Sequence, residues 1–187
     1  MKLSEHKELK TEILRLPQKE KDKLLLRLIA KDRVLTERLH FLLHEDSNAL
    51  AKRQEALKAI IIQCGKDLKK EKYSARNLLI HLRKGLRLIN HFYKVTKGNL
   101  EEAELRLFLF NRLLEDFKGG SLIFTSKDEL LLTNFVIKST LLTLKKIEKL
   151  HSDLQFDVQD DMNKLLYRIN NSRMATVART LGLPKQI

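Results

Sequence analysis

His40 and His44 are the residues whose type and spacing come closest to a metal site. They lie one helical turn apart, and Glu37 would share their face, which suits a metal ion when further ligands arrive from elsewhere. That face lies opposite the leucines of the same segment and would look toward water. No second cluster supplies paired carboxylate and histidine ligands. We therefore expect no metal or other cofactor.

Neither the single thiol nor the acidic cluster near the C-terminus indicates a catalytic site. Cys64 shares a helix side with four aliphatic residues, Leu57, Ile60, Ile61 and Leu68. We expect it to be buried and inert, because a nucleophilic cysteine needs a histidine partner that the sequence does not place. The acidic cluster consists of Asp157, Asp160 and Asp161. We interpret it as favourable negative charge near the start of a helix and not as a cation site. With no phosphate loop, nucleophile elbow or zinc spacing, we expect a non-enzymatic protein and identify no small-molecule substrate.

The strongest pattern is a one-signed helix face within residues 76–97. At 100° per residue its polar side chains fall in an arc of about 140°: Arg76, Arg83, Lys84, Arg87, Asn90, His91, Lys94 and Lys97. The opposite side is apolar, with Gly85 in its middle: Leu78, Leu79, Leu82, Leu86, Ile89, Tyr93 and Thr96. No acid occurs between Glu71 and Glu101. A solvated face is normally stabilised by Glu–Lys pairs, so this face suggests a binding role.

The positive charge of the chain is concentrated around this helix. The net charge is +13, and residues 47–98 hold 13 basic and 3 acidic side chains, a net of +10. The other segments are close to balance. They hold 11 basic and 9 acidic side chains in residues 1–46, 8 and 8 in residues 99–151, and 5 and 4 in residues 152–187. The preceding helix adds four cations, Lys52, Lys66, Lys69 and Lys70. We expect a basic helical hairpin over 47–98 whose two polar faces form one surface if they turn the same way.

Two classes of partner follow from this surface. Cations along about 30 Å of helix match a nucleic-acid backbone, which attracts them through counterion release. The first hypothesis is therefore nucleic-acid binding without sequence specificity. It assigns the contacts to Arg76, Arg83, Lys84, Arg87, His91, Lys94, Lys97, Lys66, Lys69 and Lys70. The alternative is a helical adaptor that docks an acidic protein or a second copy of the chain.

Two further binding modes are less favoured by the composition. Contact with a membrane surface is disfavoured by the absence of Trp and of an exposed apolar stripe. Binding of single strands is disfavoured because exposed aromatic side chains for stacking are scarce, with Tyr73 the main candidate.

The elements that would position these residues are all helices. Apolar residues recur with helical spacing along the chain, and sustained strand alternation is absent. Capping residues, prolines and glycines predict helices over about 4–15, 17–31, 33–45, 47–72, 74–98, 100–118, 126–151, 152–170 and 172–181. We expect an all-α, single-domain bundle of eight to nine helices over residues 1–187, with a short irregular α-solenoid as the alternative. The stretch 121–125 is expected to be a connector.

Several local details are also expected. Asp32 should cap the third helix, Gly98 should end the fifth, and Asn99 with Glu102 should form a capping box for the sixth. In the first three helices one side is expected to face the core, through Leu9, Ile13, Leu14, Leu24, Leu25, Leu28, Ile29, Leu35, Leu39, Leu42 and Leu43.

The N-terminal third also carries a combination of packing and capping residues. Leu16-Pro17 opens a helix, Leu24 to Ala30 ends on Lys31-Asp32, and Leu42-Leu43 precedes Glu45. In these features it resembles a family of small, uncharacterised all-helical bacterial proteins, over about a quarter of the chain. The resemblance implies an all-helical fold and carries no activity with it.

The composition predicts a soluble, cytoplasmic protein. A single cysteine excludes an internal disulfide, which suits a reducing compartment. The first ten residues carry charges where a signal peptide needs its apolar run, and no apolar run is long enough to span a bilayer.

Overall fold

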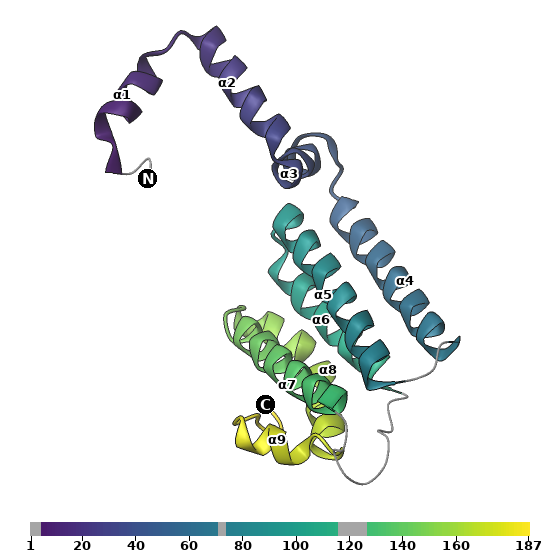
Figure 1. Cartoon of the computed structure of the whole chain (residues 1–187). Helices are drawn as coiled ribbons and strands as arrows, with labels where there is room; N and C mark the ends of the chain where they lie inside the picture. The colour runs from purple at the N-terminus through teal and green to yellow at the C-terminus, as the bar shows by residue number, and fades with distance from the viewer. Residues whose placement is uncertain (1–4, 71–73, 116–126) are drawn as a thin grey trace. The chain divides into compact units, whose positions relative to one another are not determined.

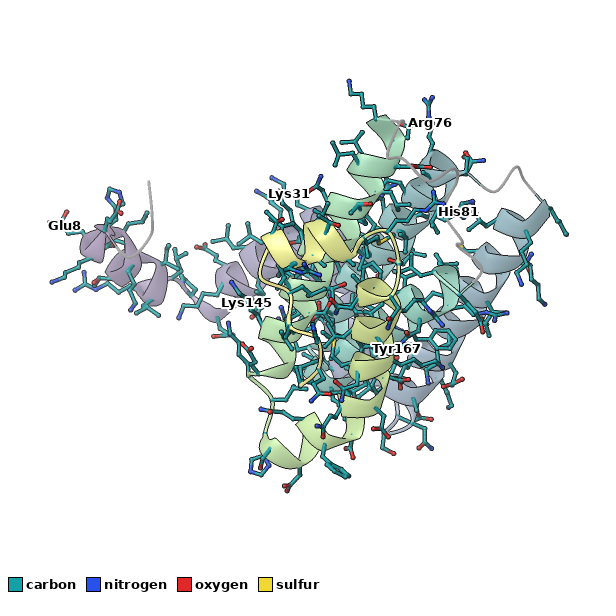
Figure 2. All side chains as sticks on the ribbon, turned by 90° about the horizontal axis from the view of Figure 1, so that it is seen from below. Glu8, Lys31, Arg76, His81, Lys145 and Tyr167 are labelled. Carbon is teal, nitrogen blue, oxygen red and sulfur yellow. The ribbon has the colours of Figure 1, made fainter. Side chains whose placement is uncertain are left out.

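The computed structural model describes residues 5–70, 74–115 and 127–187, and every regular element in them is a helix (Figure 1). Figure 2 adds the side chains. The described helices are α1 (Lys7–Arg15), α2 (Gln18–Lys31), α3 (Arg33–His44), α4 (Ala49–Lys70), α5 (Ala75–Thr96), α6 (Asn99–Leu113), α7 (Lys127–Ile147), α8 (Ser152–Asn170) and α9 (Ala175–Thr180). The all-α prediction is confirmed. Tyr73 and the connector at 121–125 lie outside the described residues.

The helices group into two compact units, Met1–Glu45 and Asp46–Ile187. Each is described by itself below. The expectation of one domain over residues 1–187 stays a prediction.

Local chemistry sets the helix boundaries of the N-terminal unit. Pro17 immediately precedes α2, where its missing N–H costs no hydrogen bond. The Asp32 carboxylate accepts a hydrogen bond from the Leu35 amide at 3.0 Å, which confirms the predicted cap of α3. The Thr36 hydroxyl also donates to the Ile29 carbonyl at 2.9 Å. These bonds tie the end of α2 to the start of α3.

The burial expected for the apolar sides of these three helices is wrong. None of residues 5–45 is buried. Ile29 and Leu39 are half-buried, and ten large side chains are 37–73% exposed: Leu9, Ile13, Leu14, Leu24, Leu25, Leu26, Leu28, Leu35, Leu42 and Leu43. The reason is that a core needs two layers of elements, and α2 and α3 contact chiefly each other. Spacing identifies the apolar side of a helix but not whether anything covers it.

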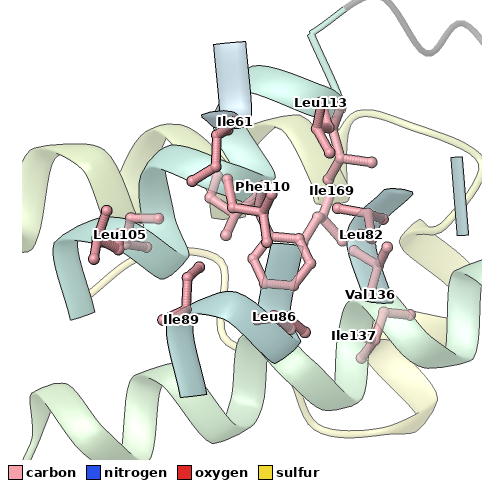
Figure 3. Packing of buried hydrophobic residues seen from close by; sticks show 14 of the residues in the cluster. Ile61, Leu82, Leu86, Ile89, Leu105, Phe110, Leu113, Val136, Ile137 and Ile169 are labelled. Carbon is pink, nitrogen blue, oxygen red and sulfur yellow. The ribbon is translucent and has the colours of Figure 1, made fainter. Parts of the chain in front are cut away.

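The Asp46–Ile187 unit is built around α6, which contacts α4, α5, α7 and α8. Most of its apolar side chains are accordingly buried: Ala103, Leu105, Leu107, Leu109, Phe110 and Leu113. Figure 3 shows Phe110 among aliphatic side chains from all four neighbouring helices. The last helix, α9, contacts α7 and α8. The core is therefore a multi-helix bundle, and its main contacts run between first and second neighbours along the chain, as they also do in short helical solenoids.

Gly85 permits the close packing of α5 on α6. A Cβ atom at this position would lie 2.5 Å from Cδ1 of Leu109. The close neighbour is thus a side chain of α6.

A buried ion-pair network joins α5, α6 and α7. Glu102 and Arg106 lie one turn apart on α6 with side chains 3% and 8% exposed, and Nη2 of Arg106 is 2.9 Å from Oε1 of Glu102. Nζ of Lys146 on α7 donates to the other Glu102 oxygen at 2.9 Å. Arg106 also donates to Oδ1 of Asn90 on α5 at 2.6 Å. Each buried charge therefore has a partner, which low-dielectric surroundings require.

Two expectations about the α5–α6 junction are wrong, and this network explains the first of them. Glu102 forms no capping box: Gly98 is the N-cap, and the Glu102 side chain instead pairs with Arg106 and Lys146. Lys97, not Gly98, adopts the left-handed conformation that ends α5, with φ of 59°, and its amide donates to the Tyr93 carbonyl at 2.9 Å. A carboxylate facing two cations is held more strongly than one facing a neutral backbone amide.

Candidate nucleic-acid interface

The apolar side of α5 is held in the core, as the sequence predicts. The Ser74 hydroxyl caps the helix by accepting from the Asn77 amide at 3.2 Å. The buried side chains include all five predicted aliphatic residues and two more: Leu78, Leu79, Leu82, Leu86, Ile89, Phe92 and Val95. Tyr93 and Thr96 are half-buried. Because this side is anchored, the opposite side of α5 has a fixed orientation.

The opposite side of α5 presents five exposed cations, Arg76, Arg83, Lys84, Arg87 and Lys94, and a sixth, Lys97, follows at the C-cap. We call these six residues the α5 basic face. Within the described part of the chain, none of them forms an ion pair with an acidic side chain. Figure 2 shows Arg76 near the start of the helix with its side chain directed outward. The face therefore keeps its full positive charge.

Two side chains alter the predicted composition of this surface. His91 is half-buried and makes a contact of its own, so it contributes less than expected. Ile80 is 52% exposed and follows Arg76 by one turn, which places an apolar side chain among the cations.

α4 adds part of the charge that the sequence predicts for it. Lys66, Lys69 and Lys70 are exposed near its C-terminal end. Lys52, at the other end, donates to the Asp46 carboxylate at 2.9 Å, and this bond lowers the pKa of Asp46. Lys52 is thus already matched by an acid.

The positive charge of Lys84 on α5 affects the buried thiol of Cys64 on α4. The thiol is buried as expected, although its predicted neighbour Ile60 is 44% exposed. Burial raises the pKa of the Cys64 thiol, and the positive charge of Lys84 opposes this rise.

Replacing Lys84 with methionine is expected to slow the alkylation of Cys64 by iodoacetamide at pH 8.5, by roughly two- to fivefold. Without the ammonium group the pKa of the thiol rises further, so a smaller fraction is thiolate at a given pH. The rate would be followed from pH 7 to 10, with Lys94→Met as the matched control. An unchanged pH profile in the Lys84 variant would place Lys84 away from the thiol.

α7 contributes to this surface in a way that sequence reasoning missed. The Arg83 guanidinium lies 5.4 Å from the centre of the Phe135 ring. Nζ of Lys146 lies 5.0 Å from the ring centre of Tyr93, and Nζ of Lys97 lies 5.2 Å from it. Such cation–π contacts orient cations without neutralising them. Lys138 and Lys145 of α7 are also exposed, as is Lys149 just after the helix.

The other candidate groups show no convergent site. Nδ1 of His40 lies 3.2 Å from Oε1 of Glu45, and the rings of His40 and His44 are 5.4 Å apart. In residues 5–70, 74–115 and 127–187, no three His, Cys, Asp or Glu side chains gather closely enough to hold a metal ion. Asp157, Asp160 and Asp161 are all exposed on α8.

Two aromatic side chains that sequence reasoning missed are highly exposed. Phe156 is 77% exposed and Tyr167 is 71% exposed, both on α8. At 100° per residue both lie on the side of α8 opposite its buried residues Val158, Met162 and Leu165, so helical spacing alone would have placed them toward solvent.

No family model, curated protein or solved structure matches the chain. The resemblance of its N-terminal third to an all-helical bacterial family stays a prediction. Over the described residues, no helix combines the length and apolar character that crossing a bilayer requires.

Proposed function

We propose that the chain is a non-enzymatic, cytoplasmic binding protein whose α5 basic face contacts nucleic acid through its phosphates. The observation that carries the proposal is the set of six exposed cations on one helix face, none of them matched by an acid in the described residues. Elsewhere in the same unit, cations such as Arg106, Arg112 and Lys58 lie beside carboxylates. Because like charges on one helix face destabilise it, a binding role accounts for the face better than stability does.

The proposed contacts position the nucleic acid without reading its sequence. The three arginines of the face suit phosphate oxygens, which a guanidinium can contact through two parallel hydrogen bonds. The burial of the opposite side of α5 fixes these groups in a row about 30 Å long. Lysines of α4 and α7 would supply further charge at the flanks. Phosphate contacts carry no sequence information, so affinity should depend little on base order.

Fluorescence anisotropy with labelled duplexes tests this proposal. Two DNA duplexes of unrelated sequence and one RNA duplex, each of about 20 base pairs, would be titrated with the full chain at 50 mM salt. We expect all three to bind, with the two DNA affinities within about threefold of each other. Absence of binding to all three would contradict the proposal, and strong preference for one DNA sequence would contradict the phosphate-only mechanism.

A helical adaptor that self-associates or docks an acidic protein is the second candidate. The ten exposed apolar side chains of α1, α2 and α3 favour it, because soluble monomers rarely leave so many apolar side chains uncovered. The near balance of 11 basic and 9 acidic residues in 1–46 would let two copies approach without repulsion.

Light scattering after size exclusion tests self-association. If the apolar faces of the N-terminal helices meet in a second copy, the mass of the full chain should rise with concentration. Leu25→Glu combined with Leu28→Glu should then keep it monomeric, whereas Lys23→Glu should not. A monomeric wild type at every concentration would rule out self-association.

An acidic protein partner requires a separate test. It would be captured from nuclease-treated lysate by the wild type and lost when Arg76, Arg87 and Lys94 are replaced by glutamate. Capture that nuclease treatment abolishes would favour nucleic acid instead.

A further inference from the structure

The last 26 residues of the chain carry a second concentration of positive charge. Residues 162–187 contain five cations and no acid, and the cations are Lys164, Arg168, Arg173, Arg179 and Lys185. The four acids of residues 152–187 all precede this segment.

All five cations line two cavities that adjoin the side chain of Tyr167. The larger cavity has a volume of about 820 Å³, and Lys164, Arg168 and Arg173 contribute to its wall. The smaller cavity, of about 380 Å³, is lined by Arg179 and Lys185. Tyr167 and Asn171 line both cavities. Both cavities are open to solvent.

The electrostatic balance of the larger cavity favours an anion. Among the described residues that line it, the one acidic side chain is Glu115, whose carboxylate lies 2.7 Å from Nη1 of Arg112 and is therefore already matched. Arg168 is held in place by donating to the backbone carbonyl of Asn111. Asp160 and Asp161 precede Lys164 by one turn but do not line the cavity. Among the described lining residues, Lys164 and Arg168 therefore leave the cavity with a positive balance, and Arg173 makes a contact of its own.

Tyr167 adds a flat aromatic surface between these charges. Its side chain is 71% exposed, so the ring is open to solvent. Figure 2 labels Tyr167 on α8. An exposed ring flanked by cations is the arrangement with which proteins bind single-stranded nucleic acid, because a base stacks on the ring and the adjoining phosphates meet the cations.

We propose that Tyr167 and the five surrounding cations form a second site, which binds an unpaired nucleotide of single-stranded nucleic acid. The base stacks on the Tyr167 ring, and the phosphates on either side of it contact Lys164 and Arg173 in one cavity and Arg179 and Lys185 in the other. This site is composed of α8, α9 and the C-terminal residues, and it does not require the α5 basic face.

Binding of a fluorescein-labelled oligothymidylate of about 15 nucleotides to the full chain tests this site, because such a strand has no duplex structure. Tyr167→Ala should weaken binding by at least about fivefold, since removing one stacking ring has an effect of that size or larger. Tyr167→Phe should retain most of the affinity, because it keeps the ring. Lys164→Glu combined with Lys185→Glu should also weaken binding.

Phe156→Ala is the matched control. Phe156 is equally exposed on the same helix, yet the cavity it lines contains Glu148 and no cation. Its removal should leave oligothymidylate binding unchanged. The proposal would be overturned if the wild type, Tyr167→Ala and Phe156→Ala proteins bound with equal affinity, or if both variants lost affinity equally. It would also be overturned if the oligothymidylate did not bind at 50 mM salt.

These experiments distinguish failure of the proposal for the second site from failure of the proposal for the α5 basic face. Replacing Arg76, Arg87 and Lys94 by glutamate should weaken duplex binding but leave the ratio between wild-type and Tyr167→Ala affinities for oligothymidylate unchanged. If the duplex binds but Tyr167→Ala does not change the affinity for oligothymidylate, only the proposal for the α5 basic face stands. Binding of the single strand through Tyr167 without duplex binding would leave only the second site.

Discussion

Replacing Glu102 with alanine is expected to lower the free energy of unfolding by about 3–5 kcal/mol. The substitution leaves Arg106 inside the bundle without its carboxylate, and it removes the acceptor of Lys146 as well. An uncompensated buried charge is among the largest destabilising effects of a single substitution. Urea denaturation followed by circular dichroism would measure the change.

Glu115→Ala is the control for this prediction. Glu115 pairs with Arg112 at 2.7 Å, but both side chains are well exposed, so its loss should change stability by at most about 0.5 kcal/mol. Replacing Glu102 and Arg106 together by leucine should destabilise less than Glu102→Ala alone, because no unpaired guanidinium remains inside. Similar effects of Glu102→Ala and Glu115→Ala would show that the buried network does not support the fold.

Reversing the charge of Arg76, Arg87 and Lys94 to glutamate is expected to weaken duplex binding by at least about tenfold at 100 mM salt. These three residues are exposed and form no hydrogen bond or ion pair with any described residue, so their replacement should leave the fold intact. Arg83 and Lys84 are less suitable, because Arg83 lies over Phe135 and Lys84 acts on Cys64. Anisotropy with a labelled duplex gives the affinities.

The matched control reverses three cations of the N-terminal unit. Lys10, Lys19 and Lys23 are also exposed, and changing them to glutamate alters the net charge by the same amount. We expect a smaller loss of affinity from this variant. Equal losses in the two variants would mean that net charge alone governs binding and that the α5 basic face has no special role.

The amphipathic character of α5 could be predicted because it depends on residues within one helix. Both sides of the helix follow from 100° spacing, and the Ser74 cap follows from a residue type at a helix start. Six cations expected on its polar side are exposed, and five aliphatic residues expected on its apolar side are buried.

Features that depend on contacts between distant residues could not be predicted in the same way. Glu102 has the spacing of a capping box, but Lys146 lies 44 residues further on, and no local pattern shows that the two meet. The apolar sides of α1, α2 and α3 have clear helical spacing, yet spacing does not reveal whether a second layer covers them.

Net charge over long sequence windows does not reveal part of the basic surface, because acids and bases in different helices cancel in the sum. Residues 99–151 hold equal numbers of acids and bases, but residues 130–151 alone hold four lysines and one glutamate. Residues 152–187 have a net charge of +1, although all their acids precede residue 162. A window of about one helix would have found both the α7 lysines and the cations beside Tyr167.

The salt dependence of duplex binding tests the central claim most directly. Six phosphate contacts predict a slope of about −5 in a plot of the logarithm of the association constant against the logarithm of the salt concentration. Replacing Arg76, Arg87 and Lys94 by glutamine should reduce this slope to about −3. A slope near zero for the wild type, or the same slope for the variant, would contradict binding through the α5 basic face.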